Sequence, residues 1–405
     1  MERTILHCDL NNFFASVSLL YNKTFYGQPV AVAGSVEQRH GIILAKNEIA
    51  KKFGVKTAEP IWKAKQKCAG LVILPPIYDK YEEFSIKARE IYHRYTDMVE
   101  PFGMDECWLD VTGSNLLFGD GKTIAKKIMR DIKEELGITA SVGVSFNKVF
   151  AKLGSDMKKP EGLTVINKEN FKEKIYSLPA RDLLFVGNST ASKLMSRGIF
   201  TIGDLTLAED EMLGKILGKN GLMLKKCAMG MDDSAVVTPK STDRPKSIGR
   251  SRTLSEDFED FDEVFRELLF YGEEIAENLR EKEVYATGVT LIIRDTDLKT
   301  NEYAIRIDSG TQTGITLART AMNLFKEHGK LPCRSVGLRA TRLKEGDTNI
   351  QLDMFSSCEE EDKLLKIEQQ ISSICARFGK NAVVRGSLLF KNKNLAPGFK
   401  PPYCR

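Results

Sequence analysis

Three acidic residues are the strongest candidates for chemistry in this 405-residue chain. Asp9 lies near the end of the short apolar run TILHCDL, and the adjacent Asp105 and Glu106 stand at a tight turn between the runs VEPFGMD and CWLDVT. Clustered carboxylates repel one another unless a cation lies among them, and their hard oxygen atoms suit Mg²⁺ or Mn²⁺. Two such ions on the attacking and leaving oxygens are what phosphoryl transfer to a hydroxyl needs. Alternatively, the three acids are unrelated and solvated.

The elements around these acids determine whether they can meet. Alternating apolar residues predict four strands, at 4–10, 99–105, 107–112 and 139–146. Helical spacing predicts a helix after Asn11 or Asn12, either of which could cap it, and longer helices at 78–99 and 123–136. Short strands and one helix between 27 and 76 form an inserted subdomain. Without it the order is β-α-β-β-α-β, a ferredoxin-like arrangement whose first and third strands are antiparallel neighbours. Asp9 is then expected beside Asp105 and Glu106.

The composition is that of a soluble globular protein with two to four domains, because 42% of its residues are hydrophobic and 28% are charged. The sequence shows neither a membrane-spanning apolar run nor a signal peptide, so we expect a cytoplasmic protein. Eight cysteines without C-x-x-C spacing, accompanied by four histidines, argue against a zinc site or a disulfide framework. The net charge of +5 is too small to establish a nucleic-acid partner by itself.

Four segments together resemble the Y-family translesion DNA polymerases of the bacterial DNA polymerase IV and V class. They are ILHCDLNNFFASV, AKNEIAKKFGVKTAEP, GMDECWLDVTG and SVGVSFNKVFAKLGSDMKKPEGLTVI. The resemblance spans nearly the whole chain and implies an α+β, multidomain right-hand polymerase. The implied parts are a ferredoxin-like palm (1–18 and 77–166), small fingers (19–76), a helical thumb (167–231), a linker (232–244), a second ferredoxin-like domain called the little finger (245–345), and a C-terminal segment (346–405).

The same resemblance assigns roles at the site. Asp9, Asp105 and Glu106 would hold two Mg²⁺ ions, for which Mn²⁺ can substitute, with help from the Leu10 carbonyl. Phe14 would be the steric gate that excludes the ribose 2′-hydroxyl, although packing on the first helix is an alternative role.

Lysines and roof residues complete the implied site. Lys159 would reach the incoming triphosphate as a point charge, and Lys152 either supports the site or is solvated. Two fingers positions depart from the family, because Lys51 stands where an arginine is usual and Glu48 where a tyrosine is common. Both changes predict a weaker grip on the triphosphate. Other implied positions are Met104, in place of a serine, and the roof residues Ile42, Leu44 and Ala58.

The remaining DNA contacts are expected in the thumb and the little finger. The thumb contains a degraded helix-hairpin-helix in which Gly187 is kept and Phe185 replaces the first glycine, so we expect modest phosphate contact. The last third shows a second β-α-β-β-α-β order, predicted to repeat the topology of the palm. Alternation along its strands would place basic residues on one face for DNA, or on a merely solvated face; they are Lys246, Arg250, Arg252, Arg294, Arg306, Arg339 and Arg342.

The pentapeptide QLDMF, at 351–355, resembles the motif that partners of the bacterial sliding clamp insert into that clamp. Gln351 would fix the register, and Leu352, Met354 and Phe355 would fill an apolar pocket. An amphipathic helix at 359–379 follows, expected to pack on the last domain or to contact a partner, and then a basic tail.

The predicted activity is template-directed addition of deoxynucleotides to a primer 3′-hydroxyl opposite damaged template. The expected partners are primer–template DNA, deoxynucleoside triphosphates and a sliding clamp, with no membrane contact, and the expected state is a monomer. The alternatives are a palm-fold nucleotide cyclase, which shares the carboxylate site, and an inactive, clamp-tethered DNA-binding protein. A P-loop at 119–123 is excluded because Leu116 occupies the position of its first glycine.

Overall fold

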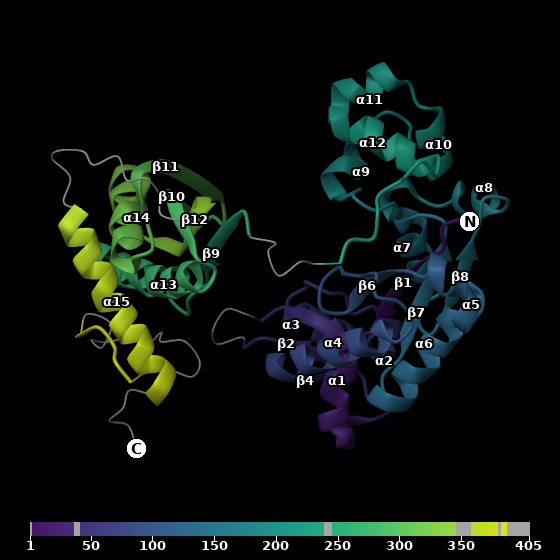
Figure 1. Cartoon of the computed structure of the whole chain (residues 1–405), viewed down its shortest axis with the longest axis horizontal. Helices are drawn as coiled ribbons and strands as arrows, with labels where there is room; N and C mark the ends of the chain where they lie inside the picture. The colour runs from purple at the N-terminus through teal and green to yellow at the C-terminus, as the bar shows by residue number, and fades with distance from the viewer. Residues whose placement is uncertain (1, 36–40, 239–244, 346–357, 380–381, 387–405) are drawn as a thin grey trace. The chain divides into compact units, whose positions relative to one another are not determined.

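The computed structural model describes the chain except for residues 1, 36–40, 239–244, 346–357, 380–381 and 387–405. The chain divides into two compact units, the first made of Met1–Gly34 and Gly41–Ser241 and the second beginning at Thr242 (Figure 1). No helix in the described ranges is long and apolar enough to cross a membrane. The clamp-like segment 351–355 and the basic tail lie outside the described residues.

The first unit contains a five-stranded sheet in the order β5-β6-β1-β7-β8. Its strands are β1 (Ile5–Leu10), β5 (Val99–Pro101), β6 (Glu106–Asp110), β7 (Ala140–Ser145) and β8 (Leu163–Ile166). Strand β1 lies antiparallel between β6 and β7, and Asp9 is paired with Glu106. The predicted convergence of the first and third strands is therefore confirmed. Strand β8, which extends the sheet in parallel to β7, was not predicted.

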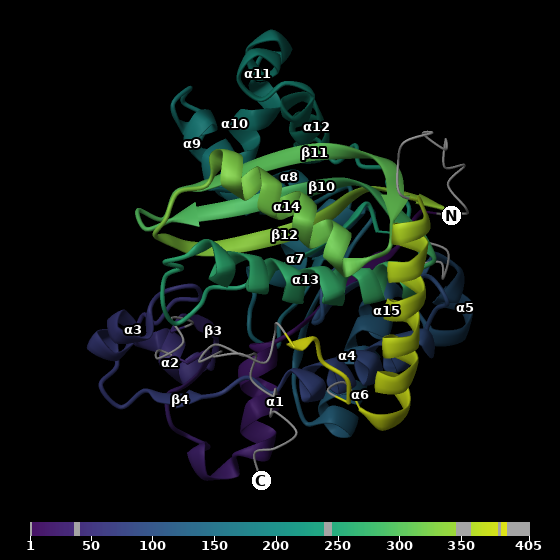
Figure 2. The same ribbon diagram turned by 90° about the vertical axis from the view of Figure 1, so that its left-hand side faces the viewer.

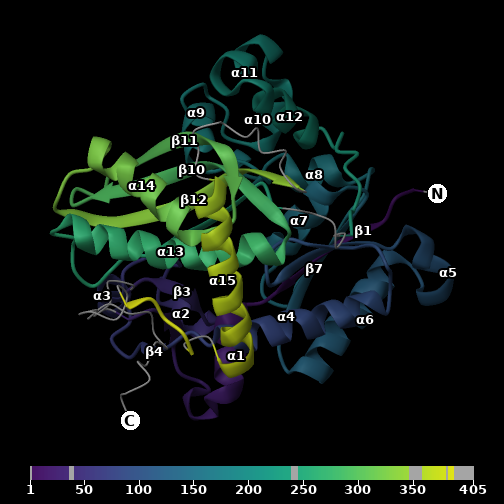
Figure 3. The ribbon, with the colours of Figure 1, turned by 60° about the vertical axis from the view of Figure 1, so that its left-hand side comes forward.

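Helices cover both faces of this sheet. Figure 3 shows β7 between α7 (Lys148–Met157) on one side and α4 (Tyr78–His93) and α6 (Gly121–Leu136) on the other. All six residues of β1 are consequently buried, including His7 and Asp9. Helix α7 approaches very closely, because a Cβ atom on Gly143 would lie 1.9 Å from the carbonyl oxygen of Ala151. The first unit also contains α1 (Phe13–Tyr21) and the short α5 (Asn115–Phe118).

The insertion is a small three-stranded subdomain with sheet order β3-β2-β4. It contains β2 (Val30–Ala33), β3 (Ile43–Lys46), α2 (Glu48–Lys52), α3 (Ile61–Lys67) and β4 (Val72–Leu74). Helix α3 was not predicted. It packs through a narrow stripe of apolar residues, Ile61, Ala64 and Cys68.

Helices dominate the chain from 167 to 231, as predicted. They are α8 (Phe171–Ile175), α9 (Asn188–Met195), α10 (Ile202–Leu207), α11 (Asp210–Leu217) and α12 (Lys219–Ala228). The next segment differs from the expected linker, because Val236 is buried against Ile5 and Trp108. The backbone N–H of Val237 also donates to Glu100 at 2.7 Å. The predicted linker, 232–244, is therefore packed on the first unit at Val236 and Val237.

The second unit has the predicted element order. Its elements are β9 (Ser247–Ser251), α13 (Phe261–Glu281), β10 (Val284–Asp295), β11 (Thr300–Thr311), α14 (Gly314–His328) and β12 (Cys333–Glu345). Its strand order is β11-β10-β12-β9, which places the first strand at an edge, whereas the first strand of the palm is central. The prediction that this unit repeats the palm topology is wrong in that respect. Figure 2 shows α13 and α14 on the same face of the sheet.

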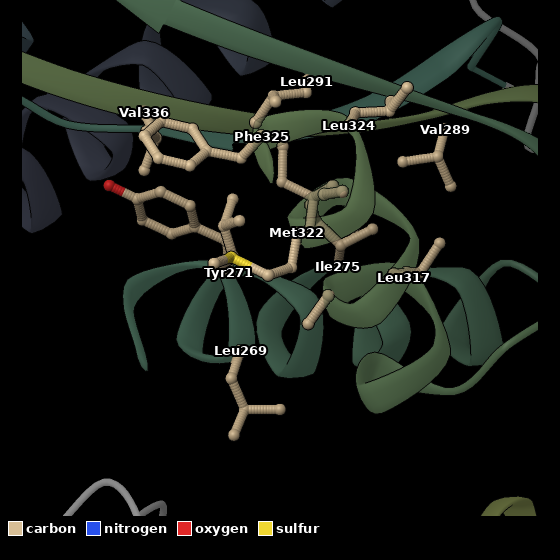
Figure 4. Close-up of a cluster of buried hydrophobic side chains, with 14 of the residues drawn as sticks. Leu269, Tyr271, Ile275, Val289, Leu291, Leu317, Met322, Leu324, Phe325 and Val336 are labelled. Carbon is tan, nitrogen blue, oxygen red and sulfur yellow. The ribbon is translucent and has the colours of Figure 1, made fainter. Parts of the chain in front are cut away.

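The core of the second unit lies between these two helices and the sheet. Figure 4 shows side chains of both helices meeting those of β10 and β12, with Tyr271, Met322 and Phe325 among them. Helix α15 (Cys358–Phe378) corresponds to the predicted amphipathic helix and packs on this unit. Its buried Glu368 accepts from the backbone N–H of Gly314 at 2.9 Å and pairs with Arg280 at 3.1 Å. Of the two contacts considered for this helix, packing on the last domain is therefore present.

Candidate active site

A cavity of ≈ 480 Å³ in the first unit brings the three acids together. Asp9 reaches it from the end of β1, and Asp105 and Glu106 reach it from the start of β6. The backbone N–H of Leu10 donates to the carbonyl of Asp105 at 3.0 Å, which fixes the two strand ends against each other. Sequence positions almost a hundred residues apart thus share one wall.

Two lysines from the region of α7 enter the same cluster. Lys159 lies 2.6 Å from Asp9 and 2.8 Å from Asp156. Lys152 lies 2.9 Å from Glu106 and 3.3 Å from Asp9. Lys152 is therefore paired with the acids and not simply solvated. Both ammonium groups occupy the negative field of the acids.

Asp105 differs from the other two acids because no described side chain forms a hydrogen bond or ion pair with its carboxylate. Burial raises its pKa to about 6, and the charges of Asp9 and Glu106 act in the same direction. Burial also raises the pKa of Asp9, although Lys159 and Lys152 oppose this effect. An unpaired, partly buried carboxylate facing two others is unfavourable unless a cation neutralises it.

The side chain of His7 lies against the carboxylate of Glu106. Nε2 of His7, a fully buried side chain, lies 3.2 Å from Oε2 of Glu106, although neither atom has a well-aligned hydrogen bond within the described residues. Nδ1 of His7 lies 2.9 Å from the hydroxyl of Ser155 on α7. Burial opposes ionisation of Glu106, but His7 and Lys152 outweigh it and hold the pKa of Glu106 at about 2. The close approach of α7 at Gly143, which pairs with His7, makes this arrangement possible.

Replacing His7 by leucine is expected to lower primer extension roughly 10- to 100-fold, because groups that orient a metal ligand contribute about this much. The Mg²⁺ concentration for half-maximal extension should rise, since Oε2 of Glu106 loses a contact that orients the carboxylate. His7→Gln, which keeps a donor, should recover part of the loss. An unchanged Mg²⁺ dependence in His7→Leu would show that His7 serves only packing.

The donor set fits a hard divalent cation, although the acids do not close around one point as they stand. Among the described residues, no group of three His, Cys, Asp or Glu side chains is arranged closely enough to hold a metal ion. Lys152 and Lys159 lie where cations are favoured, and Asp105 is unpartnered. Carboxylate oxygens with such compensation are typical ligands of Mg²⁺. Binding would require Lys159 to release Asp9.

Phe14 lines the cavity next to the acids. Its ring stacks on Tyr81, with centroids 4.2 Å apart and an interplanar angle of 9°. Tyr78 contacts it edge-on at 6.0 Å. Tyr81 is fully buried, and its hydroxyl lies 2.6 Å from that of Ser18. The ring of Phe14 is therefore both packed and exposed to the cavity, so the two roles considered for it are compatible.

The fingers contribute both acidic and basic side chains to the wall of the cavity. Glu48 accepts a hydrogen bond from Asn12 at 3.1 Å and lies 3.4 Å from Lys51. Asn12 precedes α1 in a left-handed conformation and does not cap it with its side chain. Lys46, which was not predicted from the sequence, also lines the cavity, and burial lowers its pKa. Its only signal in the sequence was its position at the end of an apolar strand.

Some of the other residues that the resemblance implies at the site line the cavity, and others do not. Leu10, Leu44 and Met104 line the cavity, whereas Ile42 and Ala58 are not among its lining residues.

Gly187 precedes α9 and is exposed. Phe185 adopts the left-handed conformation, with φ of 72°, that the missing glycine would favour.

The basic residues of the second unit do not all share one face. Arg250 lies 2.8 Å from Glu274, and Arg252 forms an ion pair with Glu267, so both point toward α13. Arg339 instead alternates with buried residues of β12 and lies 2.9 Å from Glu302 on β11, on the sheet face away from the helices. The prediction of a common basic face is wrong for Arg250 and Arg252. Lys246 is exposed, just before β9.

The fold and this cluster define a palm-type nucleotidyltransferase, and comparison with known proteins agrees. The model of the impB/mucB/samB family matches residues 8–156, and that of the impB/mucB/samB family C-terminal domain matches residues 245–354. DNA polymerase IV of Acetivibrio thermocellus is 46% identical over 96% of this chain and 98% of that protein. DNA polymerase IV 1 of Bacillus subtilis is 36% identical over 98% of this chain and 96% of that protein.

A solved structure gives the same result. The Y-family DNA polymerase chimera Dbh-Dpo4(243-245)-Dbh matches with a TM-score of 0.75 and 26% identity, over 85% of this chain and 100% of that chain. The chain therefore belongs to the impB/mucB/samB family, the Y-family of translesion DNA polymerases.

Proposed function

We propose that this polymerase adds deoxynucleotides to a primer 3′-hydroxyl, opposite damaged template bases, at the cavity lined by Asp9, Asp105 and Glu106. The observation that carries the proposal is the unpartnered Asp105 facing two further carboxylates beside Phe14. A cyclase would need no DNA-contacting domains, and an inactive binding protein would need no carboxylate cluster. Action in the cytoplasm and as a monomer stay predictions.

Two Mg²⁺ ions, or Mn²⁺, would be held by the three acids with the Leu10 carbonyl, and would supply Lewis-acid stabilisation of the transferred phosphoryl group. With Asp9 holding a cation, the Lys159 ammonium, now 2.6 Å from Asp9, would be available to the triphosphate. Lys152 stays between Glu106 and Asp156 and limits the repulsion among the acids. Lys51 would contribute only weakly, because Glu48 competes with phosphate for its charge.

Primer extension tests this function directly. Purified protein with a primed template, the four deoxynucleotides and Mg²⁺ should extend the primer, including past a damaged template base. Addition of EDTA should stop the reaction. A wild-type protein that binds primer–template DNA but does not extend it would refute the proposal.

We propose that the duplex is contacted by the hairpin at Gly187 and by the open sheet face that carries Arg339. Gly249 supports the second contact, because a Cβ atom there would lie 2.9 Å from Cγ of Arg339, so glycine lets that side chain lie across the sheet. Lys246 stays a candidate. We no longer expect Arg250 or Arg252 to contact phosphate, because α13 supplies their partners.

Clamp binding is proposed for Gln351, Leu352, Met354 and Phe355. Replacing Gln351, Leu352 and Phe355 by alanine is expected to weaken clamp affinity at least 10-fold, because such anchors contribute about 2 kcal/mol. Extension without the clamp should be unaffected, since these residues lie outside the palm. The measurement is clamp affinity by calorimetry. Equal affinity in the variant and the wild type would place the contact elsewhere.

A further inference from the structure

The outer face of α3 has no partner among the residues that the structure describes. Ile61 and Ala64 bury the inner face of the helix, while Trp62 is 63% exposed. Lys65 follows Trp62 by three positions and therefore shares its surface, and Lys63 is exposed beside it. Within the described residues, the side chains of Trp62, Lys63 and Lys65 form no hydrogen bond, ion pair or ring contact. Figure 2 shows α3 at the outer edge of the fingers.

The charge of this subdomain is unusually one-sided. The segment from Lys46 to Lys67 contains seven lysines and two glutamates, an excess equal to the net charge of +5 of the whole chain. Glu59 is already occupied by Lys67, and Glu48 by Asn12 and Lys51. An exposed indole among uncompensated lysines is the combination that holds single-stranded nucleic acid, because bases stack on the ring and phosphates meet the cations.

The position of Trp62 links this face to the candidate active site. The backbone N–H of Ile61 donates to the carbonyl of Gly41 at 2.8 Å, just before β3. Strand β3 runs from there to Leu44 and Lys46, which line the cavity. Three residues of extended chain, about 10 Å, separate Gly41 from Leu44. An unpaired strand leaving the cavity along β3 would therefore meet Trp62.

We propose that Trp62, with Lys63 and Lys65, is a stacking platform for the unpaired template strand on the 5′ side of the base being copied. The inference rests on the proposed polymerase function and adds a binding site to it. Stacking tolerates any base, since every base has a π face. A platform of this kind would hold a damaged template as readily as an intact one.

Tryptophan fluorescence tests the platform directly, because the chain has two tryptophans and Trp108 is only 3% exposed. A single-stranded oligonucleotide of mixed sequence is expected to quench the emission of the wild type, and Trp62→Phe should lose that quenching. Trp62→Ala should bind the oligonucleotide about 10-fold more weakly. Phe378→Ala, which removes a ring that is 72% exposed in the second unit, is the matched control and should bind like the wild type.

The lysines and the length of the overhang supply further readouts. Replacing Lys63 and Lys65 by glutamine should reduce the salt dependence of binding, since each phosphate contact releases counterions. On primed templates, the extension defect of Trp62→Ala should be about 10-fold with a long 5′ overhang and should shrink as the overhang is shortened.

The outcomes separate this inference from the function on which it rests. A wild type that extends no primer would refute the function. A wild type that extends primers but is not quenched by the oligonucleotide would refute the platform. An extension defect of Trp62→Ala that does not depend on overhang length would also refute it. Poly-L-glutamate carries charge but no bases, and should neither quench Trp62 nor displace the oligonucleotide. If it did both, the face would be a site for acidic polypeptides and the inference would be overturned.

Discussion

Replacing Asp105 by asparagine is expected to abolish primer extension and, at the same time, to make the metal-free protein more stable. The loss of activity should be at least 10³-fold, about 4 kcal/mol of transition-state stabilisation, because a proposed metal ligand is removed. The gain in stability follows from the pKa of Asp105, which burial and the neighbouring acids raise from its ordinary value of 3.8 to about 6. The ionised carboxylate therefore costs about 2–3 kcal/mol of the free energy of unfolding at neutral pH.

The dependence of this gain on pH has a definite sign. Because the folded-state pKa of Asp105 is raised, the folded protein binds the proton more tightly than the unfolded chain, and wild-type stability falls as the pH rises from about 4 to about 6. Asparagine carries no such penalty. The stability difference between Asp105→Asn and wild type should be full above pH 6 and vanish below about pH 4. Urea unfolding without metal, at several pH values, measures it.

Glu106→Gln provides the contrast. It should also abolish extension, but it should lower stability at neutral pH, because His7 and Lys152 favour the charged form and hold the pKa of Glu106 at about 2. Glu134→Gln, an exposed change on α6, serves as the control and should alter neither property. Asp105→Asn with wild-type extension, or with lower stability at pH 7, would contradict the role given to Asp105.

The parts of the site that the sequence predicted are those that depend on local pattern and strand order. Asp9 lies near the end of a recognisable strand, and β-α-β-β-α-β order alone places it beside Glu106. His7 was not predicted, because its role depends on how closely α7 approaches β7 at Gly143, which no local pattern records. Alternation identifies the two faces of a strand but not which face the helices cover.

The errors elsewhere have the same physical origin. Alternation along the strand assigns Arg252 to a polar sheet face, yet Arg252 forms an ion pair with Glu267 on α13. Val236 lies in a polar stretch, so its burial against Ile5 could not be expected from the sequence. Helix α3 was not predicted because lysines outnumber its few buried apolar residues. Trp62 also obscures the amphipathic pattern, because it is an apolar residue on the exposed side of the helix. Each miss depends on a partner that is distant in sequence.

Replacing Phe14 by alanine is expected to lower the discrimination against ribonucleotides roughly 10- to 200-fold, because the pocket then loses the steric clash with one hydroxyl. Phe14 can exclude that group only if its ring is fixed, and the stack on Tyr81, at 4.2 Å, fixes it. The measurement is the ratio of kcat/KM for a deoxynucleotide to that for the matching ribonucleotide.

Variants of Tyr81 separate exclusion by Phe14 from general packing. Tyr81→Phe keeps the stacked ring and removes only the contact with Ser18, so sugar discrimination should stay near the wild-type value. Tyr81→Leu removes the flat support and should allow Phe14 to move, which lowers discrimination by less than Phe14→Ala does. If Phe14→Ala discriminates as well as the wild type, Phe14 is a packing residue. If Tyr81→Leu alone has no effect, Phe14 excludes the hydroxyl without the support of the stack.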